Sequence, residues 1–142
     1  MDKKKDLASK LRTSGLRPTK QRIKLAEFLF NREKTFHFTV ENLDGAVNKK
    51  NSEDKIALAT IYNTVHAFKK AGHLKEILIK EGKSYFDTNT SSHHHFYDEA
   101  NNELIDIENN KVELKKFPTP PKGKSIKNVN VIINIDNDNQ KH

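Results

Sequence analysis

Apolar residues recur every three or four positions in three stretches of the first 72 residues, and this spacing predicts three helices. The first begins at Pro18 or Thr19, either of which suits a helix start, and continues to about Phe30. Thr39 is expected to cap the second, and the third covers residues 58–71. The apolar stripe of the third helix is formed by Leu58, Ile61, Val65 and Phe68.

The spacing then changes to that of strands. Residues 74–79 and 83–86 are short, apolar or aromatic in character, and separated by Glu81 and Gly82, which is typical of a β-hairpin. Three helices followed by a hairpin is the order of a winged helix-turn-helix domain, in which the third helix enters the major groove of DNA. This domain is expected to occupy residues 1–88.

Residues 89–142 have a different pattern, which indicates a second, smaller domain. A loop of three histidines at residues 93–95 leads into a short strand, and further strands are expected over residues 103–108 and 129–135. Prolines between residues 117 and 123 exclude a regular helix there, because proline lacks the backbone donor.

Leu, Ile, Val and Phe make up 36 of the 142 residues, which is enough for a folded chain. Hydrophobic residues nevertheless make only 34% and charged residues 32%, so burial within one subunit is small and a homodimer is expected. No apolar run approaches the roughly 18 residues of a membrane span, and the start lacks the apolar stretch of a secretion signal. The sequence therefore predicts a cytoplasmic protein without a membrane partner.

The net charge of +7 is concentrated in the first two thirds of the chain. Residues 1–24 hold nine Lys and Arg against two Asp, whereas residues 91–142 hold seven basic and eight acidic residues. Such an asymmetry favours a nucleic-acid-binding part joined to a part with another task. The simpler alternative is that abundant Lys covers solvated surfaces.

The face of the third helix opposite its apolar stripe carries small, amide and basic side chains. This face holds Ala59, Asn63, His66 and Lys70, flanked by Thr60 and Tyr62. An Asn amide can pair with adenine through two hydrogen bonds, Lys and Thr reach phosphates, and Tyr packs on a thymine methyl group. An ordinary solvated helix surface is the alternative interpretation.

The chain contains no Cys, which excludes disulfides, Cys-rich zinc sites, thiolate haem ligation and cysteine nucleophiles. Three of its seven histidines are consecutive, and consecutive strand residues point to alternate faces, so the triplet can serve two sites. Imidazole binds metal ions and is an axial ligand of haem iron. The side chains that could complete a mixed nitrogen and oxygen site for Zn²⁺, Mn²⁺ or Fe²⁺ are His37, Asp87, Glu103, Asp106 and Glu108.

Five motifs, taken in order, resemble the ferric uptake regulator family. They are residues 15–22 (GLRPTKQR), 37–43 (HFTVENL), 58–65 (LATIYNTV), 82–87 (GKSYFD) and the triplet His93, His94 and His95. The resemblance covers roughly residues 8–135. The triplet followed by Phe96 and Tyr97, the lack of Cys and the Pro-Pro segment before the last strand are most similar to the iron response regulator branch, which senses haem.

This resemblance implies an α+β fold, in which a winged helix-turn-helix domain (residues 1–88) precedes a small α/β dimerisation domain (residues 89–142). It implies a homodimeric transcription regulator of iron and haem homeostasis that binds double-stranded operator DNA. The residues expected to contact DNA, from the helix face and the resemblance together, are Arg17, Lys20, Arg22, Thr60, Tyr62 and Asn63.

The resemblance also implies ligand sites between and within the domains. The residues concerned are His93, His94 and His95 for haem, and His37, Asp87, His94 and His95 for a metal ion. Tyr97 and Phe96 stand where the family has a His and an Asp ligand, and these departures favour haem over a divalent ion. Haem is expected to shift the dimer away from its DNA-competent arrangement.

The main alternative is a manganese-, iron- or zinc-dependent repressor of the same family, in which metal promotes DNA binding and haem has no effect. An enzyme is not expected, because no HExxH or comparable spacing places an acid or base beside an open metal. The third alternative is an architectural DNA binder, which would bind without sequence preference and with steep salt dependence.

Overall fold

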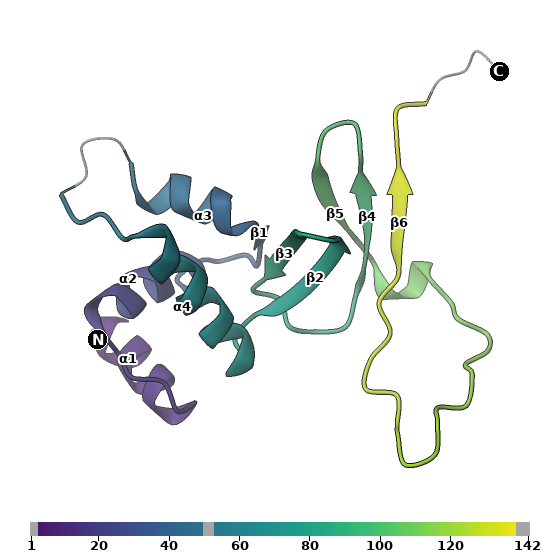
Figure 1. Ribbon diagram of the computed structural model, residues 1–142, viewed down its shortest axis with the longest axis horizontal. Helices are drawn as coiled ribbons and strands as arrows, with labels where there is room; N and C mark the ends of the chain where they lie inside the picture. The colour runs from purple at the N-terminus through teal and green to yellow at the C-terminus, as the bar shows by residue number, and fades with distance from the viewer. Residues whose placement is uncertain (1–2, 50–52, 139–142) are drawn as a thin grey trace. The chain divides into compact units, whose positions relative to one another are not determined.

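The computed structural model describes residues 3–49 and 53–138, and the chain divides into two compact units, residues 1–90 and 91–142. Within the described residues, unit 1 holds helices and a three-stranded sheet, and unit 2 holds a second three-stranded sheet (Figure 1). The expected α+β class is confirmed.

The helices of unit 1 are α1 (Lys3–Thr13), α2 (Lys20–Phe30), α3 (Val40–Val47) and α4 (Leu58–Lys70). The three helices predicted from the apolar spacing are confirmed as α2, α3 and α4. Thr39 begins α3 with a capping box, since its Oγ1 accepts the Asn42 N–H at 3.0 Å and Asn42 Oδ1 accepts the Thr39 N–H at 3.2 Å. Such local hydrogen bonds explain why the helix starts were readable from the sequence.

A hairpin of β2 (Lys75–Lys80) and β3 (Lys83–Asp87) follows α4, as predicted. Gly72 ends the helix region with φ of +90° and Gly82 turns the hairpin with φ of +75°, conformations that cost a glycine little. A further strand, β1 (His37–Phe38), pairs with the other edge of β3, so the sheet order is β1-β3-β2. The sequence did not predict β1, because two residues are too few to show alternation.

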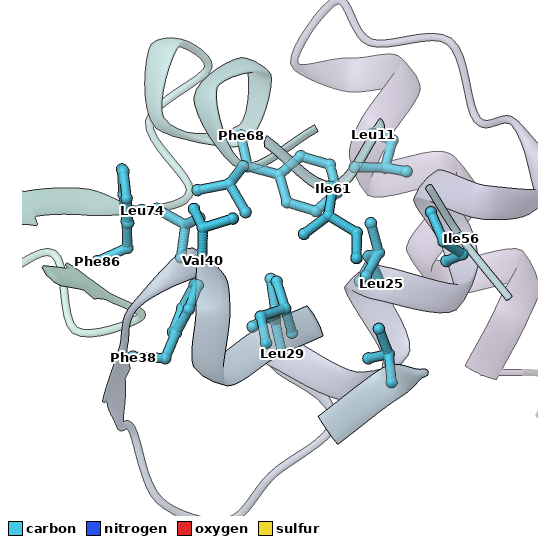
Figure 2. Packing of buried hydrophobic residues seen from close by; sticks show 14 of the residues in the cluster. Leu11, Leu25, Leu29, Phe38, Val40, Ile56, Ile61, Phe68, Leu74 and Phe86 are labelled. Carbon is cyan, nitrogen blue, oxygen red and sulfur yellow. The ribbon is translucent and has the colours of Figure 1, made fainter. Parts of the chain in front are cut away.

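The core of unit 1 is formed where the helices and the sheet meet (Figure 2). Leu25, Ile61 and Phe68 are fully buried and link α2 to α4 within one apolar cluster. Leu58 was predicted to join the stripe of α4, which is wrong: it is 52% exposed. It is the first residue of the helix, so the core does not extend far enough to cover it.

Unit 2 contains β4 (His94–Asp98), β5 (Glu103–Ile107), the 3₁₀ turn η1 (Asn109–Lys111) and β6 (Ile132–Ile135). β4 is central, pairing antiparallel with β5 and parallel with β6. The last strand was predicted from residue 129 but begins at Ile132, and no α-helix occurs in the described part of this unit. The absence of helix over residues 117–123 agrees with the prolines there.

Unit 2 buries few apolar side chains and exposes many. Among its described residues, Tyr97, Leu104 and Ile107 are the buried hydrophobic ones. The large hydrophobic side chains that it exposes are Ile105, Leu114, Phe117, Ile126, Val129 and Ile133. Such a ratio agrees with the expectation that this unit packs against a partner.

Candidate functional site

Two histidines and one aspartate of unit 2 converge on one face of the β4–β5 pair. His95 lies directly opposite Asp106 in the strand register, and His93 is two residues before His95, on the same side. Asp106 Oδ1 lies 3.2 Å from His95 Nε2 and 3.4 Å from His93 Nε2. The two imidazole rings are 4.4 Å apart, centroid to centroid. His93 and His95 are buried, whereas the Asp106 side chain is 54% exposed.

The two nitrogen–oxygen distances in this cluster are those expected around a small metal ion. Ligand atoms held at about 2.1 Å from one ion are separated by about 3.0 Å at a right angle and about 3.4 Å at a tetrahedral angle. The two nitrogen–oxygen distances, 3.2 and 3.4 Å, lie within this range of about 3.0 to 3.4 Å. Both are longer than the usual donor–acceptor distance of a hydrogen bond, which is about 2.9 Å. Two nitrogens and one carboxylate oxygen suit Zn²⁺, Mn²⁺ or Fe²⁺.

The backbone orients one of these imidazoles. His93 Nδ1 lies 2.9 Å from the carbonyl oxygen of Ser91, which can only accept, so Nδ1 carries the proton and donates it. In the neutral ring, the lone pair of His93 then lies on Nε2, the atom that faces Asp106. Sequence reasoning did not predict this role of Ser91, because a backbone acceptor leaves no mark in the residue types.

His94 lies on the opposite side of β4 from His93 and His95, as the alternation of strand residues requires. Its Nδ1 accepts a hydrogen bond from the Val131 N–H at 3.0 Å, at the start of the pairing between β4 and β6. The structure therefore does not bring all three histidines to one ligand. His94 and His95 also belong to β4 itself, whereas the sequence placed them in a loop.

The acidic residues of β5 separate in the same way. Asp106 faces the two imidazoles, but Glu103 lies opposite Asp98 at the far end of the strand pair, and Glu108 lies beyond β5. The structure thus selects one of the three acidic residues considered for this strand.

Two other expected metal ligands meet within unit 1. His37 and Asp87 are directly opposed in the register of β1 and β3, and opposed residues of an antiparallel pair share one face. Asp87 is buried, and one of its carboxylate oxygens accepts the Asn89 N–H at 2.9 Å. The His37 ring packs edge-on against Tyr85 at 6.1 Å. The sheet therefore places the side chains of His37 and Asp87 on the same face.

The outer face of α4 is open to solvent, as predicted. Tyr62 is 53% exposed and Asn63 is exposed, whereas Thr60 and His66 are half-buried. The buried side of the helix carries Ile61, Thr64, Val65 and Phe68. The polar and aromatic residues expected to contact DNA therefore lie away from the core.

The basic residues before and within α2 differ in their freedom. Arg17 and Lys20 are exposed. Arg22 is half-buried and donates from Nη1 to the carbonyl of Arg17 at 3.2 Å, while its backbone N–H is accepted by Thr19 Oγ1 at 3.2 Å. Arg22 thus braces the turn that presents Arg17.

The sequence matches the ferric uptake regulator family over residues 13–134. This chain belongs to the ferric uptake regulator family. Membership in a family of regulators agrees with the expectation that the chain is not an enzyme. Among the described residues, no helix of this family member is long and apolar enough to cross a membrane.

Two curated relatives of the chain are regulators named for peroxide. A peroxide-responsive repressor from Staphylococcus epidermidis is 33% identical over 97 residues, which are 68% of this chain and 62% of that protein. The peroxide operon regulator of Bacillus subtilis is 30% identical over 103 residues, which are 72% of this chain and 68% of that protein. The matched part spans less than two thirds of the length of the first relative.

Solved structures of the family share the fold. The ferric uptake regulator from Pseudomonas aeruginosa, determined with manganese, has a TM-score of 0.67 and 21% identity, covering 92% of this chain and 97% of that one. The comparisons do not support the resemblance to the iron response regulator branch, since these relatives are named for peroxide. Haem binding has no support from them either, whereas the two histidines and the aspartate form a donor set that suits a divalent metal ion.

Proposed function

We propose that this chain is a metal-dependent transcription regulator, which binds operator DNA as a homodimer when a divalent metal ion is bound. The observation that carries the proposal is the convergence of His93, His95 and Asp106 in a chain of this family. Of the two kinds of regulator expected from the sequence, the metal-dependent one is the better match to this donor set.

The ion is proposed to be Mn²⁺, Fe²⁺ or Zn²⁺, held by His93 Nε2, His95 Nε2 and Asp106 Oδ1. The bound ion supplies positive charge that offsets the repulsion among these electron-rich atoms. The resemblance also gives metal-ligand roles to His37 and Asp87, which are directly opposed across β1 and β3. His94, on the other side of β4, is left for a second site.

Metal binding is proposed to restrain the connection between the two units. His93 is three residues after Thr90, where unit 1 ends. An ion held by His93, His95 and Asp106 would therefore restrain the start of unit 2, next to the connection with unit 1. A ligand shifts a conformational equilibrium only by its differential affinity for the two states, so regulation requires that the ion bind the DNA-competent state more tightly.

DNA is proposed to contact the outer face of α4 and the turn before α2. Tyr62 and Asn63 are exposed on α4, where they can meet base edges with Thr60 at the flank. Arg17 and Lys20 are exposed and free to meet phosphates, and Arg22 holds the turn that carries Arg17. The positive surplus of residues 1–24 supports a polyanionic partner.

A second copy of the chain is proposed to cover the apolar surface of unit 2. Phe117, Ile126 and Ile133 are each more than 40% exposed, and few apolar residues of this unit are buried. A surface of this kind is typical of a permanent interface.

Peroxide is the first stimulus to test, because the two relatives described above are named for it. These 142 residues contain no Cys, so a peroxide response of this chain cannot use a thiol. A bound Fe²⁺ ion is one group that peroxide could oxidise instead, and comparing the Fe²⁺- and Mn²⁺-loaded protein tests this.

The proposal is tested by metal titration of the chelator-treated protein in a calorimeter, comparing Asp106→Asn with Glu103→Gln. Both substitutions remove one exposed carboxylate charge from β5, but only Asp106 faces the imidazoles. Asp106→Asn should weaken Mn²⁺ binding at least about ten-fold, and Glu103→Gln should leave it unchanged. Equal Mn²⁺ affinity in both variants would refute the site.

The same proteins are then tested for binding to a duplex enriched from a randomised pool by the Mn²⁺-loaded wild type. Chelator should release the duplex from the wild type, and Arg17→Ala and Asn63→Ala should weaken its binding at fixed salt. Lys34→Ala is the control for Arg17→Ala, because it also removes one positive charge but lies outside the proposed interface. A Soret band on adding haem that Mn²⁺ does not compete away would favour the haem-responsive regulator instead.

A further inference from the structure

Three aromatic rings connect the core of unit 1 to the exposed face of α4. The Phe86 ring, on β3, is 2% exposed and packs edge-on against His66 at 5.4 Å. His66 in turn packs on Tyr62 with the ring centroids 4.3 Å apart. Tyr62 is four residues before His66, so both rings lie on one side of the helix. The half-buried imidazole is therefore the link between a fixed ring and an exposed one.

We infer that His66 is a positioning residue for operator binding, which holds the Tyr62 ring in the orientation that meets DNA. The inference rests on the proposed function, in which Tyr62 contacts bases. It assigns His66 no contact with DNA of its own.

The support of His66 is itself held rigidly. Lys69 on α4 forms an ion pair with Glu76 on β2, one turn along from His66. β2 pairs with β3, with Glu76 directly opposite Phe86. The helix, the hairpin and the buried ring are thus joined around the imidazole, so His66 has a fixed surface to pack against.

Without His66, the phenol ring of Tyr62 would have room to move. A surface pocket of about 210 Å³ lies beside it, bounded by Val40 on α3 and by Gly82 and Ser84 on the hairpin. An exposed aromatic side chain that is free to rotate is ordered only on binding, and that ordering lowers affinity. A ring already held by its neighbour avoids most of this loss. From the usual cost of immobilising one side chain, we expect His66→Ala to weaken duplex binding about two- to ten-fold.

The inference is tested with a double-mutant cycle on the Mn²⁺-loaded full chain, using the duplex enriched by the wild type. His66→Ala should weaken binding, and His66→Phe, which retains a ring at this position, should restore it. In the Tyr62→Ala background, His66→Ala should cause no further loss, because the ring that it positions is gone. Ring-proton NMR of Tyr62 without DNA should show a shift in His66→Ala, since the neighbouring ring current is removed.

Each outcome decides the matter. A loss from His66→Ala that is the same with and without Tyr62 would show that His66 acts on DNA or on the fold directly. Unchanged binding or an unchanged Tyr62 spectrum in His66→Ala would also overturn the positioning role. Failure of the proposed function is distinguishable, because the wild type would then retain no duplex at all.

Discussion

The start of α4 depends on one asparagine. Asn48, which follows α3, donates from Nδ2 to the carbonyl of Ile56 and accepts the Ile56 N–H on Oδ1, both at 2.7 Å. Nδ2 also donates to Asp44 Oδ1 at 2.7 Å. Ala57, the N-cap of α4, makes no side-chain capping bond, so these bonds to Ile56 hold the chain where the helix begins. We therefore predict that Asn48→Ala strongly destabilises unit 1.

The magnitude follows from the groups that lose their partners. Ile56 is 3% exposed, so its N–H and C=O would stay buried without an amide to bond them. An unsatisfied buried polar group costs about 1–3 kcal/mol, and we expect the free energy of unfolding to fall by about 2–4 kcal/mol. For a domain of this size, that corresponds to a drop in the unfolding midpoint of at least about 8 °C.

Far-ultraviolet circular dichroism follows this transition, because the described α-helices all belong to unit 1. The control is Asn31→Ala, since Asn31 occupies the same C-cap position after α2 but is exposed. It should cost less than about 0.5 kcal/mol. A loss for Asn48→Ala no larger than that for Asn31→Ala would refute the reasoning.

Two further predictions concern stability. Burial, and secondly the charge of Lys10, lower the pKa of His73 from its usual 6.5, so the unfolded chain binds the proton more readily. The free energy of unfolding should fall as the pH drops through about 6.5. Urea unfolding at about pH 7.5 and pH 5.5 should show a smaller fall for His73→Gln than for the wild type, and equal falls would contradict this. Thr39→Ala should cost about 1 kcal/mol through loss of the capping box of α3, whereas Thr39→Ser should be nearly neutral; equal losses would argue against the cap.

Local chemistry explains why so much of unit 1 could be predicted. Thr39 and Gly72 act within a few residues of the chain, so their effect is written in the adjacent sequence. The stripe of α4 repeats often enough to reveal its period. Elements that depend on distant partners were missed or misplaced: β1 exists because β3 lies beside it, and β6 is shorter than its alternating segment because β4 pairs with only part of it.

The candidate site shows the same division. The sequence suggested only that consecutive histidines would point to alternate faces if they lay on a strand. The choice of Asp106 among the acidic residues of β5 depends on which residue pairs with His95. Tyr97 was interpreted as a lost metal ligand, and this favoured haem. In the structure Tyr97 is buried and its hydroxyl donates to Asn102 Oδ1 at 2.8 Å, so it serves the β4–β5 turn. A replaced ligand therefore does not by itself exclude a metal.

That turn decides which side chains reach the cluster. Asp98 Oδ1 accepts the N–H groups of Ala100 at 3.0 Å and Asn101 at 3.2 Å, and Asn102 adopts φ of +52°, so the connection has a defined length. Exposed turns usually tolerate gained or lost residues as proteins diverge. Here a slip of one position would put an isoleucine opposite His95 in place of Asp106. An insertion in this solvent-facing loop that shifted the register would remove Asp106 from the metal site, as substituting it would. The length of the loop therefore limits how this half of the protein can evolve.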